Sequence, residues 1–181
     1  MTKINLGSGY TKYPDFLNAD IDPLTNPDIL INFETGVFPL EDNTVDEIKA
    51  YHVLEHIGEG FFKLMQEMYR VCKDGAIIDI QVPHHRSEVM FGDPSHVRFI
   101  TTESLRQFSK TRNEWHIKQW NSSSGFGIKC DVDFELIEYD FVINSRWKER
   151  FKTMSQDEIM EVSSNFNNVY DEMHCKLLVV K

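Results

Sequence analysis

The interval between the first two strand-like runs limits the possible folds of this chain most strongly. Lys3–Leu6 and Phe16–Asp20 both have the composition of strands that are largely buried. Parallel neighbouring strands normally need a crossover of about a dozen residues or more, usually a helix. There is no room for that helix here, and Pro14 would interrupt one. We therefore expect an irregular crossover and a sheet that lacks part of its usual cover near the first strand.

Strands and helices alternate along the rest of the chain. The clearest helix is predicted from Glu59 to Cys72, where apolar residues recur at three- and four-residue spacing, and Gly75 is expected to cap its end. A second helix is expected to begin at Thr101 or Thr102. Further strands are expected at Asp28–Asn32, Val45–Tyr51, Ala76–Val82, Phe134–Ile143 and His174–Val180. This order predicts an α/β fold: a Rossmann-like, mostly parallel sheet with helices on its faces, an antiparallel C-terminal edge and a reduced N-terminal helix region.

Length and charge narrow the functional class. The 181 residues suit a single domain, in which residues 1–83 would bind a cofactor and residues 84–181 would form the acceptor side. A net charge of -10 argues against nucleic acid as a partner, since non-specific binding to phosphates needs a basic face. No apolar run approaches the roughly 20 residues that span a bilayer. Without a predicted signal peptide or a paired set of cysteines, we expect a cytoplasmic protein.

The glycine loop and the acid after it indicate a cofactor site. In an open parallel sheet, ligands bind beyond the carboxyl ends of the strands. Gly7-Ser8-Gly9 follows the first strand, where a loop without large side chains lets the backbone approach a ligand. Asp20 ends the second strand, where a carboxylate can accept hydrogen bonds from a ribose diol. Each feature alone has a simpler interpretation, as a turn or as a solvated acid.

Several segments together resemble the class I S-adenosylmethionine-dependent methyltransferases, in particular their short type 11 branch. They are INLGSG, FLNADIDP, FPLEDNTVDEI, HVLEHI, EMYRVCKDG and IIDIQVP, and the resemblance covers about residues 4 to 109. It implies a methyltransferase with S-adenosyl-L-methionine as cofactor. It also implies that the cofactor is held by Gly7, Ser8, Gly9, Asp20, Ile21, Asn32, Phe33 and His52. In this scheme the glycines lie at the amino-acid end, Asp20 takes the ribose, Asn32 and Phe33 line the adenine, and His52 lies near the methyl group. Glu55 and His56 have an alternative role, which is to hold the start of the following helix.

Candidates for chemistry follow the fifth expected strand. The segment PHHRSEVMFGDPSHVRF is rich in polar residues, and we expect His96, His85 and Asp93 to be catalytic, with a histidine as general base. The alternative is that Asp93 and His96 only hold their loop in place. We expect no metal site. Three histidines and an aspartate could bind Zn or Fe, but adjacent His84 and His85 point to opposite sides of an extended chain.

These features favour a methyltransferase that acts on a small polar molecule, such as a sugar or a nucleotide-sugar; the acceptor class rests on family analogy. One rival is an S-adenosylmethionine-binding protein without transferase activity. Another is an enzyme that uses a different nucleotide cofactor, although Lys12 stands where a dinucleotide-binding motif has its third glycine. Pairing of two copies through an open sheet edge stays a possibility. The aromatic residues between Trp115 and Trp147, Trp120 among them, are expected to be core rather than ligand-binding.

Overall fold

The computed structural model describes residues 1–120 and 124–181. Its strands are β1 (Thr2–Leu6), β2 (Leu17–Asp20), β3 (Ile29–Leu30), β4 (Val45–Tyr51), β5 (Cys72–Pro83), β6 (Phe134–Ile143) and β7 (Tyr170–Val179). Its α-helices are α1 (Phe61–Val71), α2 (Glu88–Gly92), α3 (Thr102–Arg106), α4 (Lys110–Lys118), α5 (Phe126–Lys129), α6 (Ser145–Phe151) and α7 (Gln156–Asn165). Two short 3₁₀ turns are η1 (Pro23–Thr25) and η2 (Leu54–His56).

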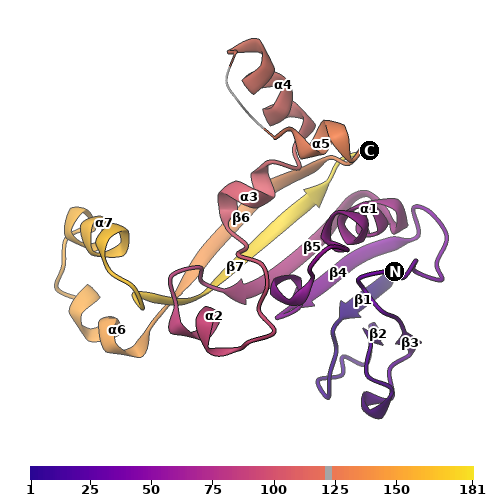
Figure 1. Ribbon diagram of the computed structural model, residues 1–181, viewed down its shortest axis with the longest axis horizontal. Helices are drawn as coiled ribbons and strands as arrows, with labels where there is room; N and C mark the ends of the chain where they lie inside the picture. The colour runs from indigo at the N-terminus through magenta and orange to yellow at the C-terminus, as the bar shows by residue number, and fades with distance from the viewer. Residues whose placement is uncertain (121–123) are drawn as a thin grey trace.

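The described strands form one sheet in the order β3-β2-β1-β4-β5-β7-β6. Strands β1 to β5 pair in parallel, whereas β7 runs antiparallel to both β5 and β6. The predicted fold class is therefore confirmed, including its antiparallel C-terminal edge. Figure 1 shows α1 and α3 over the sheet, and α6 and α7 projecting beyond one end of β6 and β7.

The expected end of the first helix is wrong. Gly75 does not cap α1, because the helix ends at Val71 and β5 already begins at Cys72. The β4–β5 register shifts from Val45 opposite Cys72 to Glu47 opposite Ile77. Gly75 lies inside this irregular stretch with φ 76°, so its left-handed conformation serves a bulge in the strand rather than a helix end.

Along β4 and β5 the sheet buries the side chains of one face. Along β5, Ile78 and Ile80 are fully buried, whereas Ile77 and Asp79 are partly exposed. The same alternation occurs in β4, where Ile48 is buried and the residues on either side of it are not. Parallel sheets are usually covered on both faces. Here the connections from β1 to β4 contain no α-helix, so the face on which those helices would pack stays open to solvent.

The N-terminal crossover covers a small part of this open face. The Lys49 ammonium on β4 lies 4.3 Å from the ring centre of Tyr13 and 5.0 Å from that of Phe16. Both rings belong to the irregular connection between β1 and β2 and its junction with β2. Cation–π contacts of this kind hold the crossover against the sheet in place of a helix. The expected absence of the first helix is thus confirmed.

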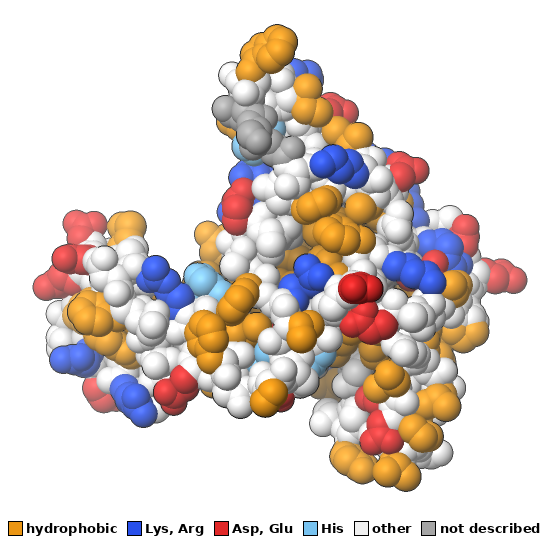
Figure 2. Space-filling model, in the orientation of Figure 1, with side chains coloured by type: hydrophobic (Ala, Val, Ile, Leu, Met, Phe, Trp, Pro, Cys, Tyr) orange, Lys and Arg blue, Asp and Glu red, His pale blue; other side chains and the backbone are white. Residues whose placement is uncertain are grey.

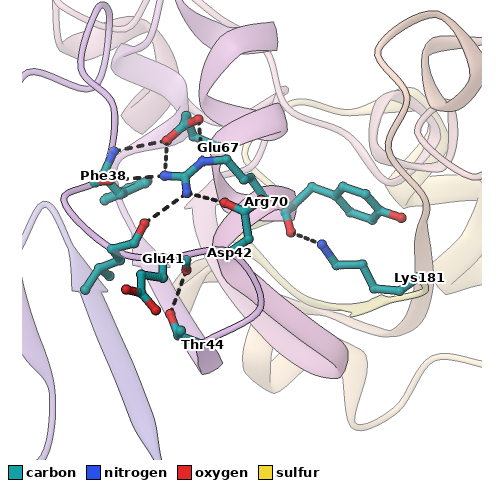
Figure 3. A network of polar contacts seen from close by, with 9 residues as sticks. Phe38, Glu41, Asp42, Thr44, Glu67, Arg70 and Lys181 are labelled. Atoms are coloured by element: carbon teal, nitrogen blue, oxygen red, sulfur yellow. Dashed lines mark hydrogen bonds and ion pairs between the residues drawn. The ribbon is translucent and has the colours of Figure 1, made fainter.

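Arg70, in the last turn of α1, fixes the loop that leads into β4 (Figure 3). Its guanidinium donates to the carbonyls of Phe38 (3.1 Å) and Leu40 (2.9 Å) and to the carboxylates of Glu67 (2.8 Å) and Asp42 (2.7 Å). The planar fork of arginine suits several acceptors at once. The arginine of the EMYRVCKDG segment therefore has a structural role here.

The C-terminal third differs most from expectation. Helices α4, α6 and α7 were not predicted from the sequence. Trp115 on α4 is 54% exposed and Trp120 is 96% exposed, so the expectation that these aromatic residues are core is wrong for both. Figure 2 shows basic and acidic side chains interspersed over the face in view. No helix among the described residues is long and apolar enough to cross a membrane.

Candidate functional site

A cavity of about 330 Å³ lies at the carboxyl ends of β1, β2 and β4. Its wall contains Gly7, Asp20, Ile21, Asn32, Phe33, Glu34, His52, Val53, His56 and Ile57. The structure therefore brings together six of the eight residues expected around the cofactor. The other two, Ser8 and Gly9, follow Gly7 in the same loop, where Ser8 is buried and its amide donates to the Ala19 carbonyl.

Glycine is the only residue type that fits at position 7. Its φ is 59°, in the left-handed region that side chains disfavour. A Cβ there would also lie 2.4 Å from Cγ2 of Val53, another residue of the cavity wall. The close approach of the loop to Val53 depends on the missing side chain.

Asp20 organises the glycine loop. One carboxylate oxygen accepts from the Gly9 amide at 2.7 Å, and the other accepts from the Asp22 amide at 2.9 Å. The side chain is largely buried, yet it lies in the cavity wall. A carboxylate has about four acceptor sites, so each oxygen keeps capacity for a ligand hydroxyl. Asp20 can thus both shape the loop and bind a diol.

Glu34 was missed by sequence reasoning. It lies in the cavity wall, and its carboxylate accepts from the amides of Gly58 and Gly60, just before α1. A Cβ on Gly60 would lie 2.2 Å from the Glu34 carbonyl oxygen, so the two segments are tightly packed. The sequence offered one signal for it: Glu34 follows the third expected strand, at the end where ligands bind in such sheets.

His52 has a strained backbone and two acidic neighbours. Its φ is 56°, which is uncommon for a residue other than glycine. Nδ1 lies 3.4 Å from Glu55 Oε1, and Nε2 lies 3.6 Å from Glu172 Oε1. Glu55 raises the pKa of His52 above its usual value against the opposing effect of burial, and Glu172 adds to the rise. Glu172 was also missed, because no motif marks this residue of the antiparallel β7.

A second, larger cavity of about 780 Å³ lies between the end of β5 and α7. Its wall includes His84, His85, Arg86, Phe141 and Tyr170. Burial lowers the pKa of His84 to about 4, and burial followed by the charge of Arg86 lowers the pKa of His85. His84 Nδ1 accepts from the Arg86 amide at 3.2 Å. Both imidazoles are therefore neutral near pH 7 and can accept or donate a hydrogen bond.

The three residues expected to be catalytic are not brought to one place. His85 lines the second cavity, whereas the ring of His96 packs edge-on against His56, with centroids 4.7 Å apart, at the wall of the first. Asp93 Oδ2 lies 3.8 Å from His96 Nε2. Hydrogen bonds from Ser95 lower the pKa of Asp93.

The loop that carries Asp93 and His96 docks onto η2. The amides of Val97 and Arg98 both donate to the Glu55 carbonyl, at 2.9 and 3.1 Å. The Arg98 guanidinium continues the contact with bonds to the carbonyls of Ile57 (3.0 Å) and Gly58 (2.6 Å). The DPSH and LEHI segments of the sequence are thus one structural unit beside the first cavity.

Comparison with known proteins gives a family match and many structural matches. Residues 16–80 match the family described as Methyltransferase domain. A SAM-dependent methyltransferase from Archaeoglobus fulgidus is similar in structure, with a TM-score of 0.67, 15% identity, and coverage of 98% of this chain and 85% of that one. A methyltransferase of Thermotoga maritima, described as a possible histamine N-methyltransferase, has a TM-score of 0.57 at 12% identity, covering 98% and 81% of the two chains.

The structural matches extend beyond methyltransferases. The [4+2]-cyclase SpnF has a TM-score of 0.59 at 13% identity, with 99% of this chain and 75% of that chain covered. No curated protein matches the sequence. At these identities the structural likeness establishes the fold, and the family match covers the segment from β2 to β5.

Proposed function

We propose that the chain is a class I S-adenosylmethionine-dependent methyltransferase, as the sequence resemblance indicated, and that it methylates a small polar acceptor; the match of residues 16–80 to the Methyltransferase domain and the shared fold support this. The observation that carries this proposal is the first cavity. It gathers Gly7, Asp20, Phe33 and His52 at the carboxyl ends of the parallel strands, where ligands bind in such sheets.

The residues present suit S-adenosylmethionine. Asp20 keeps acceptor sites for the ribose hydroxyls, and Gly9, where an added Cβ would meet no atom within 4 Å, leaves room for the amino-acid end. Phe33, only 6% exposed, offers an apolar wall for adenine beside Asn32. The bound cofactor would supply the methyl group and its sulfur leaving group. The protein's task is then mainly to align the acceptor with the methyl group.

We place the acceptor in the second cavity. Glu172 connects the two cavities, since it contacts His52 and lies opposite Pro83, immediately before His84 and His85. The wall of the second cavity combines imidazole, guanidinium and hydroxyl groups with the rings of Phe141 and Tyr170. Such a wall suits a sugar or a nucleotide-sugar. His85, kept neutral by its lowered pKa, is the proposed general base.

A rival function is cofactor binding without methyl transfer. The fold is shared with a [4+2]-cyclase, and the open face of the sheet leaves a surface that a partner could use. In both functions the first cavity binds the cofactor. Only the methyltransferase transfers its methyl group to an acceptor.

Calorimetry with S-adenosylhomocysteine and NAD as separate ligands tests the proposal. We expect the wild-type protein to bind S-adenosylhomocysteine and not NAD. Asp20→Asn should weaken binding at least about tenfold, because a charged acceptor of hydroxyl hydrogen bonds is lost. Asp22→Asn is the matched control, since that carboxylate caps η1 through the Leu24 amide and should leave binding unchanged. Absence of S-adenosylhomocysteine binding, or equal loss in both variants, would overturn the assignment of this cavity.

A further inference from the structure

Three groups that can bind a metal meet where η2 contacts the loop after α2. Glu55, His56 and His96 each place one ligand atom within 4.8 Å of the other two. Two of these residues are neighbours in the LEH turn, and the third comes from the docked DPSH loop. The hydrogen bonds from Val97 and Arg98 to the Glu55 carbonyl hold the two segments together.

Glu55 is buried and lacks a hydrogen-bond donor. Its side chain is about 1% exposed, and neither carboxylate oxygen accepts a hydrogen bond within the described part of the chain. The nearest cationic group is His52, whose Nδ1 is 3.4 Å from Oε1. A buried carboxylate is costly unless it is paired, hydrogen-bonded or bound to a metal. The Glu55 carboxylate has the His52 imidazole as a neighbour but accepts no hydrogen bond among the described residues, so a further positive partner beside His56 and His96 would stabilise it.

The hydrogen bonds of His96 determine which of its nitrogens is free. Nδ1 lies 3.0 Å from the Met90 carbonyl oxygen, which can only accept, so Nδ1 carries the hydrogen. In the neutral ring Nε2 then has a lone pair. That atom lies 3.8 Å from Asp93 Oδ2, which is also an acceptor.

His56 is oriented in the same way through Ser95. The Ser95 hydroxyl donates its single hydrogen to Asp93 Oδ1 at 2.6 Å. Oγ of Ser95 also lies 2.9 Å from His56 Nδ1. Because its hydrogen is already donated to Asp93, Oγ accepts a hydrogen from that nitrogen. The lone pair of His56 is consequently on Nε2. Metal-binding histidines typically donate their other N–H to a carbonyl or another acceptor in this manner.

We propose that Glu55, His56 and His96 bind a divalent transition-metal ion, with Asp93 close enough to support His56 and His96 from outside. Two imidazoles and a carboxylate are a donor set that suits zinc and iron. Three protein ligands leave at least one coordination position open. This set differs from the one weighed in the sequence analysis: His84 and His85 lie in the wall of the other cavity, and a glutamate takes their place.

The open position gives the ion a use in the proposed function, and this part rests on that function. His56 lies in the wall of the first cavity, so an ion on its ring would face the space assigned to the cofactor. The acceptor, held in the second cavity, must extend its reacting oxygen to the methyl group in the first cavity, and that oxygen would complete the coordination shell. A metal-bound hydroxyl loses its proton more readily than a free one.

Calorimetry with ZnCl₂ on tag-free, chelator-treated protein tests the site. We expect one equivalent of Zn²⁺ to bind to the wild type. Glu55→Gln and His96→Gln should each weaken binding at least about tenfold, and Ser95→Ala about tenfold through the loss of the support to His56. His174→Gln is the control, because its imidazole contacts Glu172 on β7 outside the cluster, and it should bind zinc like the wild type.

Thermal unfolding gives a second measurement on the same samples. Zinc should raise the Tm of the wild type and of His174→Gln but not that of Glu55→Gln, since only a folded site gains binding energy. Glu55→Gln should fold, because the change removes a buried charge that accepts no hydrogen bond among the described residues and keeps the shape of the side chain. Zinc binding that is absent, or unchanged in both Glu55→Gln and His96→Gln, would overturn the proposed metal site.

The outcome is separable from the test of the first cavity. Zinc binding without S-adenosylhomocysteine binding supports the metal site and removes the proposed function. S-adenosylhomocysteine binding without zinc binding supports the proposed function and removes the metal site.

Discussion

At the scale of single residues, the first cavity is built from positions that are conformationally unusual. Gly7 and His52 both have φ values in the left-handed region, 59° and 56°. Gly7 does so without cost, whereas His52 keeps a conformation that is uncommon for its side chain. Such strain persists where surrounding contacts hold it, and it is frequent at functional sites. The two acidic neighbours of His52 provide that restraint.

His84 should make the stability of the protein depend on pH. Its pKa is about 4 in the folded chain because of burial, against an ordinary value near 6.5 in the unfolded chain. As the pH falls below about 6.5, the unfolded chain takes up the proton first, so the free energy of unfolding decreases until the pH nears 4. We expect a loss of about 2 kcal/mol from this group, measured by urea unfolding at pH 7 and pH 4.5.

His84→Gln supplies the comparison for that measurement. It removes the titrating ring while its amide oxygen can still accept from the Arg86 amide. The variant should lose about 2 kcal/mol less than the wild type between the same two pH values. Parallel pH dependence in the two proteins would assign the effect to other groups.

At the scale of elements, the end of α1 is linked to the start of β4 by one arginine. Arg70 makes charge-assisted bonds to two carboxylates and two carbonyls of a loop that has no regular structure (Figure 3). The hydrogen bonds from Arg70 lower the pKa of Glu67, and the bond that its carboxylate accepts from the Phe38 amide adds to this effect. The loop is therefore ordered by side chains rather than by strand pairing.

Arg70→Lys should destabilise the protein by about 2 kcal/mol. A lysine has the charge but not the fork, so it cannot satisfy the two carbonyls and both carboxylates together. Arg112→Lys is the matched control, because its bond to Glu103 lies at the surface, and it should change stability by less than about 1 kcal/mol. Urea unfolding of the three proteins measures the difference; equal effects would mean that the loop does not depend on the bidentate geometry.

At the scale of the whole molecule, the chain forms one mostly parallel sheet that helices cover mainly on one face. The packed face joins the sheet to α1 and α3 in a single core. The open face is stabilised by polar pairs across its strands, such as Lys3 with Glu47 at 2.7 Å and Lys176 with Glu138 at 2.9 Å. These pairs place charged side chains, rather than apolar ones, on the face that no helix covers.

Two adjacent isoleucines of β5 test this one-sided packing. Ile78→Ala should cost about 2–5 kcal/mol, because its side chain is fully buried on the covered face. Ile77→Ala, on the open face between Glu47 and Leu178, should cost about 1 kcal/mol or less. The free energies of unfolding from urea titration give both values. A large cost for Ile77→Ala would mean that a second copy or another segment covers this face in solution.

The sequence by itself determined the order of most elements and the position of the first cavity. Strand and helix periods are local properties, so Val45–Tyr51 and Phe134–Ile143 were predicted with their observed bounds. The glycine loop and Asp20 could be predicted for a similar reason, since the carboxyl ends of parallel strands always meet at one edge of the sheet. The absence of the first helix followed from the short interval between the first two strands and from Pro14 within it.

The tertiary structure alone decided which polar residues meet. His85, Asp93 and His96 are close in sequence, yet His85 is separated from the other two, because the DPSH loop docks on the Glu55 carbonyl while His85 stays at the end of β5. The same docking buries Glu55 beside His56 and His96, which no local pattern encodes. It depends on contacts across some forty residues of chain, such as those from Arg98 to Ile57 and Gly58. Long-range hydrogen bonds of this kind have no period in the sequence, so only the folded chain shows where they form.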